Sequence, residues 1–277
     1  MPNAKDRPPE TTYQRLLVVG RTGSGKTSQI WTLPGKKFAY IFDPNAMATL
    51  RGCDLDYEEY YPDFLQLDAT LKGFNKGSKS DRLQDRREPT LYLRWVEDIN
   101  KKVAEGFFKQ YDWIVFDSLT FLVKAIMDRQ AYINNRYGEV EERGDYRVVG
   151  SKTADLFTSI CSLSINIYAT AHIRSFENET THKVEVELSL PGRSRTALPL
   201  MFTSIWEATY ENTEKGGPYY IRTKPDPRGL KDIRSSIPGL ETMQDVTIKG
   251  FNEDAAGRQG IGALISRVAK QRLAMVK

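Results

Sequence analysis

The sequence predicts an α/β fold with a mainly parallel central sheet flanked by helices. Two observations predict it. Short apolar runs recur along the chain without alternating polar positions, as in strands buried on both faces, and segments of helical length separate them. The predicted strands are residues 16–19, 38–42, 113–116, 165–170 and 203–210.

The helices and edge strands are predicted from spacing and composition. Leu156, Ile160 and Leu163 recur at helical spacing, so we expect a helix over residues 151–163, with Ser151 as its cap. A short helix is expected over residues 26–32, and a basic amphipathic helix over residues 260–276 closes the chain. Residues 218–224 and 245–251 are interpreted as short antiparallel edge strands late in the chain.

The chain divides into an arm, one large domain and an extension. Residues 1–12 are polar and contain proline, residues 13–240 hold the predicted sheet, and residues 241–277 form a C-terminal extension. Within the domain, residues 72–90 are almost free of apolar side chains and predict an exposed basic insertion. Two further irregular stretches are expected, at residues 134–150 and 174–199.

Composition favours a cytoplasmic protein. The chain has 277 residues, 40% of them hydrophobic, with no apolar run long enough to cross a bilayer and no signal peptide at the N-terminus. Its two cysteines, Cys53 and Cys161, are interpreted as reduced thiols. The formal net charge of +4 is too small to indicate a nucleic-acid binder, but seven basic and three acidic residues between Lys72 and Arg94 account for the whole excess.

The turn after the first predicted strand carries a complete phosphate-binding motif. Its spacing is G-x-x-x-x-G-K-[ST], between an apolar strand and a helix, so loop amides and the helix N-terminus point at phosphates. Lys26 is expected to reach the β- and γ-phosphates of ATP, and Thr27 to join the Mg²⁺ shell. The predicted nucleotide-binding residues are Gly20, Arg21, Thr22, Gly23, Ser24, Gly25, Lys26, Thr27 and Ser28.

A second carboxylate is needed to hold the metal. Asp117 ends the apolar strand of residues 113–116, and we predict that it supports Mg²⁺. The next residue is Ser118 rather than a glutamate, so the group that activates water must come from elsewhere.

Asp43 and His172 are the candidates at the same edge of the sheet, because the carboxyl ends of parallel strands meet there. Asp43 could orient or deprotonate the attacking water, or only cap the turn formed with Pro44 and Asn45. His172 could sense the γ-phosphate, or be an ordinary core histidine.

The order of these motifs resembles the RecA-like P-loop ATPases. The segments DYRVVGSKTADLF, IYATAHIR, LPGRSRTALP and YYIRTKPDPRGLKDIR are similar to the short phage RecA-core ATPases of single-strand annealing, over roughly residues 16–239. The resemblance implies a RecA-like core with a late antiparallel edge hairpin. It also implies roles for Lys26 and Thr27 in binding phosphate and Mg²⁺, for Asp117 in supporting the metal and for His172 as a sensor. The chain departs from the pattern at Asn45, where RecA has its activating glutamate, which implies slow hydrolysis.

The resemblance also implies a basic pair that reaches the γ-phosphate of a neighbouring subunit. Lys231 and Arg234 match it best, with one residue more between them than usual, although solvated surface charge is an equal interpretation. If they act in trans, the protein assembles head to tail as a ring or a filament.

RecA-like proteins present two loops to single-stranded DNA, and their counterparts here are residues 134–150 and 174–199. The second loop is predicted to bind DNA through arginine and lysine, with Phe176 available for stacking and several glutamates opposing contact. The predicted DNA-binding residues are Arg174, Lys183, Arg193 and Arg195, with Arg193 and Arg195 weighted most.

The leading hypothesis is therefore a Mg²⁺-dependent, DNA-stimulated ATPase of a phage-type recombination system that binds single-stranded DNA and promotes annealing or strand exchange. It is expected in the cytoplasm, that of a bacterial host if the protein is encoded by a phage. Its expected partners are single-stranded DNA, other copies of itself and a single-strand-binding protein, with no membrane. One alternative is a nucleotide or small-molecule kinase, with residues 72–90 as a lid. The other is a nucleotide-gated scaffold with little hydrolysis.

Overall fold

A computed structural model describes residues 13–62, 88–137, 141–177, 179, 182, 184–212, 217–226 and 229–275. The predicted arm, most of the predicted basic insertion and Lys183 lie outside these residues. Among the described residues, no helix combines the length and the apolar composition that crossing a membrane requires.

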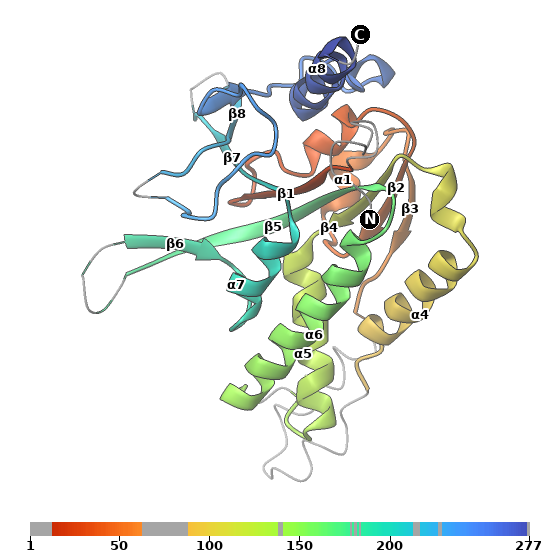
Figure 1. The fold of residues 1–277 in the computed structure, drawn as a ribbon. Helices are drawn as coiled ribbons and strands as arrows, with labels where there is room; N and C mark the ends of the chain where they lie inside the picture. The colour runs from red at the N-terminus through yellow and green to blue at the C-terminus, as the bar shows by residue number, and fades with distance from the viewer. Residues whose placement is uncertain are drawn as a thin grey trace, which may run out of the picture.

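A central sheet runs through the molecule (Figure 1) in the strand order β3-β2-β4-β5-β1-β7-β8-β9. Its parallel part contains β1 (Arg15–Gly20), β2 (Lys37–Ile41), β3 (Asp56–Glu59), β4 (Trp113–Asp117), the first half of β5 (Asn166–Glu177) and β7 (Ser204–Tyr210). β8 (Tyr219–Arg222) and β9 (Met243–Asp245) add an antiparallel edge. The predicted α/β fold with a mainly parallel sheet and a late antiparallel edge is confirmed.

Helices cover both faces of the sheet, which is why the central strands β1, β2 and β4 are buried along their whole length. One face packs against α4 (Leu91–Ala104), α5 (Leu119–Ile133) and α6 (Arg143–Cys161), and its core includes Leu17, Trp95 and Phe157. The other face packs against α1 (Ala46–Leu50), the 3₁₀ helix η3 (Ser28–Thr32) and α8 (Gly260–Met275), around Val18 and Ile261. The two layers lie on opposite sides of the sheet in Figure 1.

The C-terminal extension contributes to this second core. Gly262 of α8 lies so close to the Thr32 carbonyl that a Cβ there would be 1.6 Å from its oxygen, and Gln29 accepts a hydrogen bond from the Ile261 amide at 2.9 Å. The helix after the glycine-rich turn is thus held between β1 and α8.

Several predicted boundaries were wrong. α6 begins at Arg143 rather than at residue 151, so half of the irregular stretch predicted over residues 134–150 is helical. Its start is a capping box between Glu142 and Asp145, and Asp145 is buried with hydrogen bonds from Asn134 and Arg136. The late edge strand is β9, which ends at Asp245 where the predicted strand begins.

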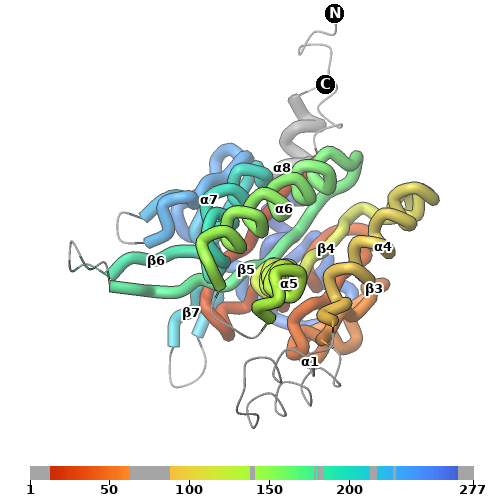
Figure 2. Tube along the Cα trace, turned by 90° about the horizontal axis from the view of Figure 1, so that it is seen from below, coloured from red at the N-terminus to blue at the C-terminus, as the bar shows by residue number. Residues whose placement is uncertain are grey.

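The stretch predicted as irregular over residues 174–199 also has regular structure. β5 continues to Glu177 and pairs with β6 (Val184–Leu188) as an antiparallel hairpin, and this arm projects from the body of the molecule in both views (Figures 1 and 2). It is followed by the short helix α7 (Ser194–Ala197) and the 3₁₀ helix η5 (Leu198–Met201).

Candidate functional site

The predicted phosphate-binding turn lies at the carboxyl end of β1, between β5 and β7 in the sheet. Gly23 and Gly25 have φ angles of 80° and 84°, which side chains with a Cβ rarely adopt. At Gly20 a Cβ would lie 2.5 Å from the Ala208 carbonyl oxygen, so the turn needs glycine there for close approach to β7. These glycines shape the loop as the motif predicts.

Lys26 lies inside this loop. Its Nζ donates hydrogen bonds to the carbonyl oxygens of Gly20 at 2.9 Å and Arg21 at 2.8 Å, and the residue is 6% exposed. Burial lowers the pKa of Lys26 to about 8, although Asp117 and Asp43 oppose that shift. The ammonium therefore gains from an anionic partner that would replace the two carbonyls.

Asp117 connects the loop to β4. Thr27 Oγ1 donates a hydrogen bond to Asp117 Oδ2 at 2.8 Å, and the Thr170 hydroxyl donates to Oδ1. The carboxyl is 1% exposed, and burial raises its pKa while the two hydroxyls lower it. Thr170 belongs to β5, so three neighbouring strands converge on this group.

Two buried hydroxyls at the same place have no hydrogen-bond partner among the described residues. Ser24 is 3% exposed and Ser118 is 1% exposed, and neither Oγ is paired. An unpaired buried polar group costs free energy unless a ligand satisfies it. Together with the hydroxyl and carboxylate oxygens of Thr27 and Asp117, they fit a site for phosphate and for Mg²⁺, which prefers oxygen ligands.

Asp43 and His172 face each other across the rim of the sheet. His172 Nε2 is 3.8 Å from Asp43 Oδ2, and both side chains are mostly buried. The imidazole of His172 lowers the pKa of Asp43, with burial acting in the opposite direction. Asp43 Oδ1 also accepts the Asn45 amide at 2.9 Å, so the turn-capping contact exists beside the one with His172.

The two residues of the basic pair predicted to act in trans have different surroundings in the structure. The Arg234 guanidinium donates to the carbonyl oxygens of Pro199 at 2.5 Å and Phe202 at 2.8 Å, while Lys231 is exposed. Arg234 therefore stabilises the packing of its own chain, and a role in trans remains a prediction for both residues.

The predicted DNA-binding arginines also differ in the contacts that their side chains make. Glu187 on β6 accepts hydrogen bonds from Arg174 at 2.7 Å and from Arg195 at 2.8 Å, so the two arginines share one carboxylate. Arg195 also donates to the Leu190 carbonyl. Arg193 makes no side-chain hydrogen bond or ion pair with the described residues.

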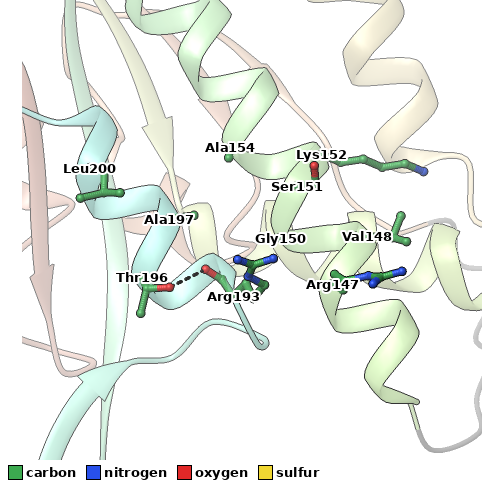
Figure 3. A pocket seen from close by; sticks show the side chains of 10 residues that line it. All are labelled: Arg147, Val148, Gly150, Ser151, Lys152, Ala154, Arg193, Thr196, Ala197 and Leu200. Atoms are coloured by element: carbon green, nitrogen blue, oxygen red, sulfur yellow. Dashed lines mark hydrogen bonds between the residues drawn. The ribbon is translucent and has the colours of Figure 1, made fainter.

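Arg193 lines a pocket of about 750 Å³ between α6 and α7 (Figure 3). Arg147 and Lys152 line it from α6, and Leu200, 72% exposed, lies at its α7 side. The Lys152 ammonium donates a hydrogen bond to Gln130 on α5 at 3.2 Å. The guanidinium groups of Arg147 and Arg193, by contrast, have no partner in the described part of the chain. The pocket also has hydroxyl and apolar lining: Val148, Gly150, Ser151, Ala154, Thr196 and Ala197.

Two glycines bring the walls of this pocket together. A Cβ on Gly150 would lie 2.7 Å from Arg193 Cβ, and one on Gly192, whose φ is 49°, would lie 2.6 Å from Tyr146 Cβ. Sequence analysis missed Lys152 and assigned no role to Arg147, although Arg147 falls within the predicted DNA-facing stretch. Recognising the capping box at Glu142 would have placed Arg147 on a helix.

Comparison with known proteins gives the family. Residues 12–230 match a family described as AAA domain, and no curated protein is significantly similar to the chain. Among solved structures, the KaiC-like protein PH0186 from the hyperthermophilic archaeon Pyrococcus horikoshii is similar at 13% identity, with a TM-score of 0.35 over 77% of this chain and 80% of that one. The family match spans more than half of the chain and includes the glycine-rich loop and Asp117. The chain therefore belongs to the AAA domain family and has a P-loop ATPase fold.

Proposed function

We propose that the protein binds Mg²⁺ and ATP at the P-loop and hydrolyses ATP to ADP and phosphate. The observation that carries this proposal is the hydrogen bond of 2.8 Å between Thr27 and the buried Asp117, beside the unpaired hydroxyls of Ser24 and Ser118. Thr27 and Asp117 would hold Mg²⁺, directly or through water, and the metal would neutralise phosphate charge. Lys26 would exchange its two carbonyl partners for β- and γ-phosphate oxygens.

We assign to Asp43 the role of orienting the attacking water. Its pKa is lowered by His172, so it is ionised at neutral pH and can accept a hydrogen bond from water. A carboxylate with a low pKa orients water better than it removes a proton, which agrees with the slow hydrolysis implied by Asn45. His172, from the strand that also carries Thr170, would register the γ-phosphate.

A second proposed function is the binding of single-stranded DNA in the pocket between α6 and α7. The specific observation is the pair of guanidinium groups, Arg147 on α6 and Arg193 beside α7, that line the pocket and have no partner among the residues that the structure describes. None of the described residues that line the pocket is aromatic, so contact with the phosphate backbone is favoured over stacking of bases. Binding should therefore depend weakly on sequence and strongly on salt.

The proposal also includes annealing or strand exchange in phage-type recombination and assembly with other copies of the chain. Both rest on the RecA-like resemblance alone. The kinase alternative has support only from residues 72–90, most of which lie outside the described chain. The scaffold alternative depends on Asn45, and a direct measurement of turnover separates it from the ATPase.

The test is ATP hydrolysis at fixed low salt with and without single-stranded DNA. We expect DNA to stimulate the wild type, Lys26→Ala to lose hydrolysis altogether, and Arg147→Ala/Arg193→Ala to keep the basal rate and lose the stimulation. Arg258→Ala, which removes an exposed arginine paired with Asp254, is the matched control. Transfer of phosphate to a nucleotide acceptor without stimulation by DNA would favour the kinase.

A further inference from the structure

We propose that Arg21 is a catalytic arginine that acts within its own chain, binding the γ-phosphate of ATP during hydrolysis. The inference rests on the proposed ATP hydrolysis and adds a residue to it. The phosphate-binding motif requires no particular side chain at this position.

The backbone of Arg21 lies at the phosphate site. It follows Gly20 directly at the end of β1, and its carbonyl oxygen is 2.8 Å from Lys26 Nζ, the predicted phosphate-binding group. Gly20 is paired in register with His172 on β5. The backbone of Arg21 therefore lies at the same rim of the sheet as Asp43 and the sensor candidate His172.

The guanidinium has a weak partner that ATP could replace. Its Nη2 donates to Ser175 Oγ at 2.8 Å, on the outer part of β5, and the contact is exposed. A neutral hydroxyl in solvent is a poorer partner than a phosphate oxygen, with which an arginine forms charge-assisted and often bidentate hydrogen bonds. The Arg21 charge also counters the rise in the pKa of Glu207 on β7, so the guanidinium is held by one exposed hydrogen bond and one electrostatic interaction.

The other arginine considered for this task is already occupied. Arg234 donates to two backbone carbonyls of its own chain, so its release would leave both acceptors without partners. Release of Arg21 from Ser175 leaves an exposed hydroxyl, which water can satisfy, and gives up a favourable charge interaction with Glu207, which Arg222 also pairs. The difference in cost favours Arg21 as the cation for the γ-phosphate.

In the reaction, the water oxygen forms a bond to the γ-phosphorus while the bond from that phosphorus to the bridging oxygen breaks. The electron pair stays on the ADP β-phosphate, and the proton of the water passes to Asp43 or to the released phosphate. Arg21 transfers no proton. It donates hydrogen bonds to γ-phosphate oxygens, whose charge is redistributed in the transition state, and so lowers the barrier more than it strengthens binding.

The experiment measures single-turnover hydrolysis at saturating ATP for wild type, Arg21→Ala and Arg21→Lys, with Arg258→Ala as the control. We expect Arg21→Ala to be slower by about 100-fold or more, Arg21→Lys to recover only part, and ADP affinity to stay within about twofold of wild type. Equal thermal melting of the variants excludes misfolding. A wild-type rate in Arg21→Ala overturns the inference.

Mixing protomers distinguishes action in cis from action in trans. Arg21→Ala keeps the phosphate-binding lysine, and Lys26→Ala keeps the arginine, so a mixture regains hydrolysis only if Arg21 reaches a neighbouring site. We expect no recovery at any mixing ratio, and recovery overturns the inference. A wild type that hydrolyses no ATP overturns the proposed function as well, whereas an active wild type with an equally active Arg21→Ala overturns this inference alone.

Discussion

The Thr27 hydroxyl donates a hydrogen bond to Asp117 Oδ2 across 2.8 Å and thereby joins the P-loop to the end of β4. Replacing Asp117 with asparagine keeps the shape and removes the charge. We expect Asp117→Asn to weaken Mg²⁺-dependent ADP binding by at least about tenfold and to leave metal-free ADP binding nearly unchanged, because the carboxylate supports the metal in the proposed site. Titration calorimetry with Mg²⁺ and with a chelator checks this, and an equal loss in both conditions would contradict it.

Lys26 predicts a pH dependence of nucleotide binding. Its pKa is about 8 in the nucleotide-free protein, so near pH 8 about half of the molecules carry a neutral amine. Phosphate favours the charged form, so binding at that pH takes up a proton and affinity falls as the pH rises above 8. Calorimetry in buffers of different ionisation enthalpy measures the uptake. Lys26→Met should bind weakly without uptake, and a wild type without uptake would refute the assignment.

The pair formed by Asp43 and His172 predicts a separate pH effect on turnover. Asp43→Asn should lower hydrolysis by about 100-fold while ADP affinity is kept. Because His172 lowers the pKa of Asp43, His172→Gln should raise that pKa. The acid limb of the rate profile should then move to higher pH, since the carboxylate is lost earlier as pH falls. An unmoved limb would mean that Asp43 does not control it.

Glu187 holds Arg174 and Arg195 away from other anions. Glu187→Gln should release both, raise affinity for single-stranded DNA and steepen the dependence of log affinity on log salt by about 1–2. Fluorescence anisotropy between low and moderate salt measures both quantities. Glu253→Gln, an exposed substitution far from the arm, should change neither.

Asp145 predicts the largest effect on stability. It is fully buried, and it accepts hydrogen bonds from Arg136, Asn134 and the Glu142 amide. Asp145→Ala leaves the Arg136 charge without this partner and should cost about 3–5 kcal/mol, seen as a fall in melting temperature of about 10 °C. Exposed Asp155→Ala is the control and should melt within about 1 °C of wild type.

The same carboxyl predicts acid sensitivity. Burial alone would raise its pKa, but the hydrogen bonds from Arg136 and the backbone lower it overall. The contribution of Asp145 to stability is therefore present above the ordinary aspartate range and is lost as the pH falls through the lowered pKa. Unfolding curves at decreasing pH should converge for wild type and Asp145→Ala.

The parallel sheet could be predicted because β1, β2 and β4 are buried on both faces and are therefore largely apolar along their length, and most of β5 and β7 is buried as well. The P-loop could be recognised because phosphate chemistry fixes the spacing and context of its residues, and the structure places the predicted Asp117 within hydrogen-bonding distance of Thr27 in that loop. The start of α6 was missed because its cap uses Glu142 and Asp145, an acidic variant of the usual pattern.

The hydrogen-bond and ion-pair partners of individual side chains were harder to predict than the helices and strands. The sequence favoured Arg193 and Arg195 equally, yet Glu187 pairs with Arg195 and Arg174, while Arg193 lines the pocket. The same is true of Arg234, which binds carbonyls that only the folded chain brings to it. The pairing of Thr170 with Asp117 likewise depends on β5 lying beside β4.

The most direct test of the central claim is release of phosphate from ATP in the presence of Mg²⁺ by wild type, Lys26→Ala and Asp117→Asn. We predict that the wild type releases phosphate steadily, at whatever rate, and that neither variant releases phosphate above background. Equal release by Lys26→Ala, or no release by wild type with or without single-stranded DNA, would contradict the claim that this site hydrolyses ATP.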